Sequence, residues 1–225
     1  MKLFKITFVS IITILLFSSI FMSCKSSDDG SKSTDNSTST DNTTTSTWTK
    51  QLGTSSSDRG NGVITDSSGN IYVSGYTEGN LDGNTNSGQG DIFLVKYNSS
   101  GTKQWTKQLG TSGSDEGSGV TTDSSGNIYV TGSTGGGLDG LESTGGTDIF
   151  LVKYNSSGKK LWITQIGVFH EDLVLRSYGK GVITDSSGNI YVTGHTMGGL
   201  DNNKSLGEWD SDVFLIKYTS SGTKQ

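Results

Sequence analysis

Short apolar runs separated by turn residues fill the chain after residue 47 and predict β-strands. The first four runs are Gly62–Thr65, Asn70–Gly75, Ile92–Tyr97 and Lys103–Leu109. They are rich in Val, Ile, Tyr, Phe, Thr and Trp, and clusters of Gly, Asn and Ser bound them. Ser-Ser-Gly segments join the first run to the second and the third to the fourth. These segments suit tight hairpins, because Gly accepts a positive φ and Asn or Asp caps the turn.

The third run carries apolar residues on both faces of the predicted strand. Ile92–Val95 has no polar alternation, whereas a strand with one solvated face alternates apolar and polar residues. A strand that is covered on both sides fits a sheet stacked between neighbouring sheets. Four antiparallel strands in each unit, stacked face to face, describe the blade of a β-propeller.

The same set of runs occurs three times. The motif that begins at Trp48 returns at Trp105 and Trp162, and both intervals are 57 residues (105 − 48 and 162 − 105). Such a period indicates that one unit is one supersecondary element that must pack on its neighbours. We expect the repeated Trp, Asp and Gly positions to be structural. They are Trp48, Trp105, Trp162, Asp66, Asp123, Asp185, Gly69, Gly126 and Gly188.

The repeated motifs also carry a family resemblance. The pattern Asp-x-x-Gly-Asn-Ile-Tyr-Val-x-Gly, followed by Asp-Ile-Phe-Leu-Val-Lys-Tyr and Gly-x-x-x-Trp, resembles the bacterial SBBP β-propeller repeat over residues 48–225. The resemblance implies a propeller in a secreted or surface protein and no defined enzymatic activity. We therefore predict an all-β fold, an array of three four-stranded antiparallel blades at about 62–109, 119–166 and 181–225, preceded by an outer strand at 48–52.

The number of units leaves closure of the propeller open. Three blades would each have to subtend about 120°, wider than blades do in rings of four to eight. Gln225 followed by Trp48 would regenerate the repeat. The arrangements that remain are a strained three-blade ring, a homo-oligomer in which a head-to-tail dimer has six blades, and an interrupted or partial propeller. We favour the partial propeller over the dimer.

Residues 1–23 read as a lipoprotein signal peptide. Lys2 and Lys5 precede the apolar stretch Ile6–Phe21, which is short for a membrane span of about 20 apolar residues. The stretch ends in Phe-Met-Ser-Cys, which resembles a bacterial lipoprotein box, although Phe and Met are bulkier than the usual residues. We expect lipid on Cys24, the one Cys of the chain, and hence export and anchoring in the bacterial cell envelope. An ordinary signal peptide with an incidental Cys is the alternative.

The segment that follows predicts a tether. The tether spans residues 24–47, and after Cys24 it consists almost entirely of Ser, Thr, Asp, Asn, Lys and Gly. Because they offer no apolar side chains to bury, they cannot offset the entropy of ordering. We therefore expect a disordered link between the lipid and the propeller repeats.

Composition excludes several function classes. A net charge of −5 argues against nucleic-acid binding, which needs clustered Lys and Arg. One Cys and two His exclude a disulfide framework, a Cys-based zinc site and an iron–sulfur cluster. Oxygen-rich loops around Asp82, Asp139 and Asp201 raise the question of Ca²⁺. Without a recognised calcium-loop spacing we favour turn capping, and we expect no cofactor and no metal.

Variation among the three copies indicates a binding face. The loop between the second and third strands (the middle loop) and the loop that leads to the next unit (the joining loop) change in length, whereas the hairpins do not. Variable loops on a rigid scaffold commonly carry binding function, and aromatic residues and Arg dominate interface energies. We expect a patch for a glycan or protein ligand formed by Phe169, His170, Glu171, Arg176, Tyr178 and Trp209.

Three readings of function follow. We favour non-enzymatic adhesion or binding through this loop face. In the second, the long joining loop merely caps the end of a blade, and the chain is a truncated or structural fragment without a specific ligand. In the third, the chain is a hydrolase of the glycosidase type with two convergent carboxylates, drawn from Glu171, Asp172 and Glu208.

Overall fold

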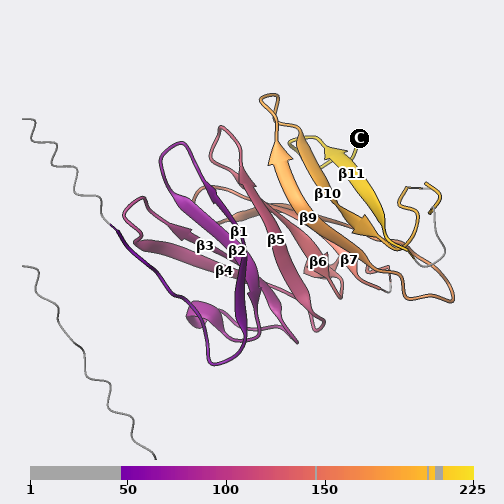
Figure 1. The fold of residues 1–225 in the computed structure, drawn as a ribbon, viewed down its shortest axis with the longest axis horizontal. Helices are drawn as coiled ribbons and strands as arrows, with labels where there is room; N and C mark the ends of the chain where they lie inside the picture. Colours follow the sequence, from indigo (N-terminus) through magenta and orange to yellow (C-terminus); the bar gives the residue numbers. More distant parts are fainter. Residues whose placement is uncertain (1–46, 145, 202, 206–209) are drawn as a thin grey trace, which may run out of the picture. The chain divides into compact units, whose positions relative to one another are not determined.

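A computed structural model describes residues 47–144, 146–201, 203–205 and 210–225. All of them lie in the compact unit Thr45–Gln225 (Figure 1). The predicted signal peptide, most of the tether, Cys24 and Trp209 lie outside the described residues. Within those residues, no helix has the length and apolar character needed to cross a bilayer.

The described residues form three antiparallel sheets, which confirms the all-β prediction. Each sheet follows the order of the chain, so every strand pairs with the one before it. Sheet 1 contains β1 (Asp58–Thr65), β2 (Ile71–Thr77), β3 (Asp91–Tyr97) and β4 (Lys103–Leu109). Sheet 2 contains β5 (Asp115–Thr122), β6 (Ile128–Thr134), β7 (Asp148–Tyr154) and β8 (Lys160–Ile166). Sheet 3 contains β9 (Ser177–Thr184), β10 (Ile190–Thr196) and β11 (Asp212–Tyr218).

The structure corrects three details of the predicted blades. Sheet 3 has three strands within the described part of the chain, not four, although Lys224 forms an isolated bridge with Tyr218 where a fourth strand would begin. Residues 48–52 form no strand. The strand edge that could pair with them is β11 of sheet 3, but residues 48–52 lie against sheet 1. Each first strand also begins four residues earlier than predicted. In β1, Gly60 and Gly62 flank a β-bulge, which interrupts the alternation of apolar and polar residues.

Apolar side chains hold the sheets together. We call the side of a sheet that looks toward the next sheet along the chain its back face, and the other side its front face. Ile92 and Leu94 on the back face of sheet 1 pack with Val120, Phe150 and Val152 of sheet 2. Ile92 and Leu94 are 2% and 1% exposed. Each such side chain stabilises the stack by about 1.5–3 kcal/mol, so neighbouring sheets depend on one another.

The first strands of the sheets lie side by side along the inner edge of the stack (Figure 1). Glycine makes this approach possible, because a Cβ on Gly62 would lie 2.7 Å from the carbonyl oxygen of Ser118. A Cβ on Gly119 would lie 3.0 Å from the carbonyl oxygen of Lys180. The Gly-x-Gly element therefore brings the backbones of neighbouring sheets together along this edge.

The hairpins have the predicted chemistry. Asp66 Oδ1 accepts hydrogen bonds from the backbone N–H groups of Ser68 and Asn70, both at 2.9 Å. Its Oδ2 accepts one from the Tyr72 hydroxyl at 3.0 Å. Burial raises the pKa of Asp66, but these hydrogen bonds outweigh it, so the pKa falls below its usual value. Gly69 takes φ +75° in the same turn, and the turns at Asp123 and Asp185 repeat the arrangement.

The repeated tryptophans join neighbouring sheets. The ring of Trp105 lies 6.1 Å from that of Tyr72 in its own sheet. On the other side, a Cβ on Gly158 in the last hairpin of sheet 2 would lie 3.1 Å from the Trp105 indole. Trp162 has the same relation to Tyr129 and to Gly222.

Candidate functional site

The middle and joining loops lie at one end of the sheets. Gly90 of the first middle loop forms a parallel bridge with Ser114 of the joining loop that follows. The N–H group of Asp115 donates to the carbonyl oxygen of Gly90 at 2.8 Å. Thr147 and Arg176 form the same bridge one unit later. Because the strands are antiparallel, the hairpins occupy the opposite end, so the loops that vary in length share one face.

The long joining loop between sheets 2 and 3 is partly packed and partly exposed. A Cβ on Gly198 in the last middle loop would lie 2.8 Å from side-chain carbons of both Val168 and Leu175. By contrast, Phe169 is 76% exposed and Val174 is 70% exposed. Part of the insertion therefore covers the end of sheet 3, as the capping alternative expects, and part presents apolar surface to solvent.

The polar residues of this loop are exposed. The Nδ1 atom of His170 accepts a hydrogen bond from the backbone N–H group of Asp172 at 3.1 Å, and Glu171 is exposed beside them. Arg176 is exposed too, while its carbonyl oxygen accepts from the N–H group of Met197 at 2.9 Å. The backbone around Arg176 is thus held in place, while the residue itself is exposed.

Tyr178 belongs to a different constellation from Phe169 and His170. It lies in β9 opposite His195 in β10, and the two rings stack with their centroids 4.9 Å apart and an interplanar angle of 29°. The Lys180 Nζ atom lies 5.4 Å from the centre of the Tyr178 ring. Sequence reasoning singled out Tyr178 but missed His195 and Lys180, because cross-strand neighbours are distant in sequence.

The same cross-strand position differs in each sheet. It pairs one residue of the first strand with one of the second, next to a fixed Gly–Gly pair. The pairs are Arg59 with Tyr76, Glu116 with Ser133, and Tyr178 with His195. Since the first strands are adjacent along the inner edge, these pairs form a row of charged and aromatic side chains, which we call the inner row. The sequence does carry a signal for the inner row: the residues beside the repeated glycines differ among the three copies.

A polar cleft opens along the inner row between sheets 1 and 2. It has a volume of about 230 Å³ and is lined by Arg59, Tyr76, Glu78, Ser114 and Glu116. The Tyr76 hydroxyl donates to Oε1 of Glu78 at 2.6 Å. This hydrogen bond, together with partial burial, raises the pKa of Tyr76 to about 12. The cleft offers a guanidinium, two carboxylates and a phenol to a polar ligand.

The aspartates that open the third strands are structural. Asp91 and Asp148 are fully buried. The Oδ2 atom of Asp148 accepts from the N–H group of Thr144 at 3.0 Å and from Gln165 Nε2 at 2.7 Å. Asp91 makes the equivalent contacts with Ser87 and Gln108. Each of these carboxylates therefore ties a middle loop to the fourth strand of its own sheet.

The aspartates of the middle-loop turns have salt-bridge partners. Asp82, at φ +52°, pairs with Lys103. Asp139 and Asp201 are likewise in the left-handed region and pair with Lys160 and Lys224. Across the part of the chain that the structure describes, no three His, Cys, Asp or Glu side chains gather in a way that could hold a metal ion.

Comparison with known proteins adds the family. The β-propeller repeat named SBBP matches residues 47–82, 104–139 and 161–201 of this chain. An uncharacterized WD repeat-containing protein of Acanthamoeba polyphaga mimivirus is 36% identical over 101 residues, which are 40% of this chain and 7% of that protein. Regulatory protein FlaEY of Caulobacter vibrioides is 27% identical over 179 residues, which are 72% of this chain and 18% of that protein. The chain thus spans less than a fifth of the length of either relative.

Proposed function

The chain belongs to the SBBP family of β-propeller repeat proteins, and from this premise we propose that it is a non-enzymatic binding module. The proposed ligand lies at the loop end of the sheets and along the inner row. The observation that carries this proposal is that the three copies keep their hairpins, glycines and core but differ at this end. Variation confined to one face of a rigid scaffold is typical of recognition.

A glycan is the ligand class that we propose. The stacked rings of Tyr178 and His195 offer a flat surface for the apolar face of a sugar ring. Arg59 and Glu116 provide a charged donor and a charged acceptor in the same row, and hydrogen bonds to charged groups are the stronger ones. Arg176 and Phe169 extend the surface over the joining loop. A protein ligand is the alternative, since aromatic residues and Arg also dominate protein interfaces.

A glycan array tests this proposal. The labelled full chain is applied to printed bacterial and host glycans, next to a variant that carries Arg59→Ala and Tyr178→Ala. We expect the variant to bind at least about 10-fold more weakly, a loss that corresponds to about 1.4 kcal/mol. A matched control replaces Ser68 and Ser100 in the hairpins at the opposite end and should bind as the parent does. Equal binding by parent and variant would remove the inner row from the site.

The hydrolase alternative has its own test. Incubation of the chain with the glycans that it binds, followed by mass spectrometry of the products, detects turnover directly. We expect the glycans to remain intact. Cleavage that is lost in the Glu171→Gln variant would instead favour the paired-carboxylate reading. A chain that neither binds nor cleaves any glycan or protein would favour the structural-fragment reading.

We propose a lipid anchor on Cys24 as the second part of the function. The support is the charged and apolar leader that ends at this residue, and two or three acyl chains give durable membrane attachment where one does not. Metabolic labelling with a palmitate analogue should mark the protein in its bacterial host, and Cys24→Ser should abolish the label. A labelled Cys24→Ser variant would contradict the lipidation site.

A further inference from the structure

The two outer faces of the stack expose residues that the inner faces bury. On the back face of sheet 3, Val213 and Leu215 are 85% and 72% exposed. Their counterparts on the back face of sheet 2, Ile149 and Leu151, are both 1% exposed. On the front face of sheet 1, Val63 is 69% exposed. An apolar surface of this kind marks an interaction site or an aggregation hazard.

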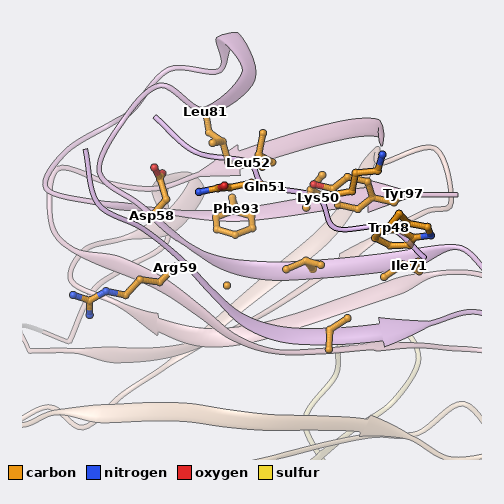
Figure 2. A pocket seen from close by; sticks show the side chains of 14 residues that line it. Trp48, Lys50, Gln51, Leu52, Asp58, Arg59, Ile71, Leu81, Phe93 and Tyr97 are labelled. Carbon is orange, nitrogen blue, oxygen red and sulfur yellow. The ribbon is translucent and has the colours of Figure 1, made fainter. Parts of the chain in front are cut away.

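Each outer face is also hollowed. A groove of about 400 Å³ lies on the front of sheet 1, lined by Val63, Phe93 and Val95 and by the segment Trp48–Leu52. Figure 2 shows this segment above the face, with Phe93 and Tyr97 beside it. A second hollow of about 350 Å³ lies on the back of sheet 3.

Segment Trp48–Leu52 lies where the fourth strand of a preceding sheet would lie. A Cβ on Gly101 in sheet 1 would be 2.8 Å from the Trp48 indole, and one on Gly158 in sheet 2 would be 3.1 Å from the Trp105 indole. Lys50 and Lys107 are equivalent too, because their Cε atoms would lie 3.0 Å and 2.8 Å from a Cβ on Gly101 and on Gly158, respectively. Within the described residues, this segment therefore holds the place of a fourth strand, and no strand of a preceding sheet comes before it.

Sheet 3 has the complementary arrangement: in the part of the chain that the structure describes, its first three strands are present and most of a fourth strand is not. The fourth begins where Lys224 bridges Tyr218 and the N–H group of Gln225 donates to the Lys217 carbonyl oxygen at 2.9 Å. Lys224-Gln225 followed by Trp48–Leu52 spells Lys-Gln-Trp-Thr-Lys-Gln-Leu, which is the sequence of β4 residue for residue.

We propose that the back face of sheet 3 binds the front face of sheet 1 of a second copy of this chain. Trp48–Leu52 of that copy completes sheet 3 as its fourth strand and places its indole on Tyr191, as Trp105 lies on Tyr72. Lys217 then donates to the Ser99 carbonyl oxygen of the second copy, as Lys153 donates to Ser220 at 3.2 Å.

Two copies joined at both ends form a closed ring of six blades. Rings of four to eight blades are the usual range, and closure removes the exposed edge of β11, which would otherwise invite uncontrolled strand pairing. A head-to-tail contact is heterologous, so only a rotation that closes the ring limits the assembly to two copies. This inference concerns assembly and does not depend on the ligand proposed above.

Two charge substitutions test the orientation of the contact. Leu215→Asp spoils the back of sheet 3 and Val63→Asp spoils the front of sheet 1. Each variant, produced as the full chain with two different affinity tags, should fail to co-purify with itself. The Leu215→Asp chain mixed with the Val63→Asp chain should co-purify one to one, because each supplies the face that the other lacks.

Controls make every outcome decisive. By light scattering the parent should run at twice the mass of a single copy, and it should co-purify with itself. So should Val174→Asp, which alters an apolar residue, 70% exposed, in the joining loop between sheets 2 and 3. Matching circular dichroism spectra show that the variants are folded. We expect either interface variant to weaken self-association at least about 100-fold. A monomeric parent, self-association of the Val63→Asp chain, or mixed variants that stay apart would each overturn the proposal.

Discussion

Shortening one leucine in two equivalent places measures the energy of sheet stacking. Leu151 and Leu215 occupy the same position in sheets 2 and 3, but they are 1% and 72% exposed. Leu151→Ala removes three carbon atoms from a closed core, which costs about 0.8 kcal/mol for each carbon, and the cavity adds to this. We expect a loss of about 3 kcal/mol in the free energy of unfolding. Leu215→Ala should change it by less than about 0.5 kcal/mol.

Urea unfolding followed by circular dichroism provides the measurement. Both substitutions are placed in the Val63→Asp chain. We expect this chain to be monomeric because it cannot form the head-to-tail contact, so that Leu215 stays exposed. With a urea dependence of about 2 kcal/mol per molar, Leu151→Ala should lower the midpoint by about 1.5 M, whereas Leu215→Ala should leave it unchanged. Equal shifts for the two variants would refute the argument that stacking, and not the strand itself, gives this leucine its stabilising role.

Three further predictions concern the backbone and the buried carboxylates. Gly75→Ala should destabilise the fold severely, because its Cβ would lie 1.9 Å from the Arg59 carbonyl oxygen. Gly60→Ala should be tolerated, because the nearest atom to its Cβ would be 3.4 Å away. The midpoints of thermal unfolding of the two variants provide the comparison, and equal midpoints would contradict the argument. Asp123 has its pKa lowered because its hydrogen bonds outweigh burial, so its contribution is present above the unfolded pKa of about 3.9 and is lost as the pH falls through the folded value. Unfolding between about pH 5 and pH 2 should therefore depend less on pH in Asp123→Asn, and an identical profile would contradict this assignment. Burial raises the pKa of Asp91, and its Oδ1 atom has no hydrogen-bond partner within the described residues; Asp91→Asn should match or exceed the parent in stability at pH 7, and a clear loss by urea titration would show that the charge is needed.

Much of the local structure was predictable from the sequence, because its causes are local. Alternating and continuous apolar runs located the strands, and the Ser-Ser-Gly segments located the hairpins, where Gly69 has the positive φ that the turn requires. The spacing of the repeats predicted the stacked sheets and the end that carries the variable loops. The beginnings of the first strands were misplaced, since Gly60 and Gly62 give no apolar signal at the bulge. The strand expected at 48–52 and the fourth strand of sheet 3 were also wrong for the described chain, because residues 48–52 lie against sheet 1 and not beside β11 of sheet 3.

The inner row depended on tertiary structure. Tyr178 and His195 are 17 residues apart (195 − 178), yet register places their rings in contact. Glu116 meets Asn61 across two sheets, with Asn61 Nδ2 donating to Glu116 Oε1 at 2.9 Å. Neither pair follows from a periodicity, because both result from which strands lie next to each other.

The three equivalent leucines separate the two contributions. Leu94, Leu151 and Leu215 stand in almost identical sequences, and the strand pattern predicts the same buried face for all of them. They are 1%, 1% and 72% exposed. The sequence by itself determined that each leucine needs a neighbouring sheet, since an apolar face is stable only when it is covered. Which leucine has such a neighbour was decided by the tertiary structure, because the stack ends at sheet 3 and its last face meets no other sheet of the described chain.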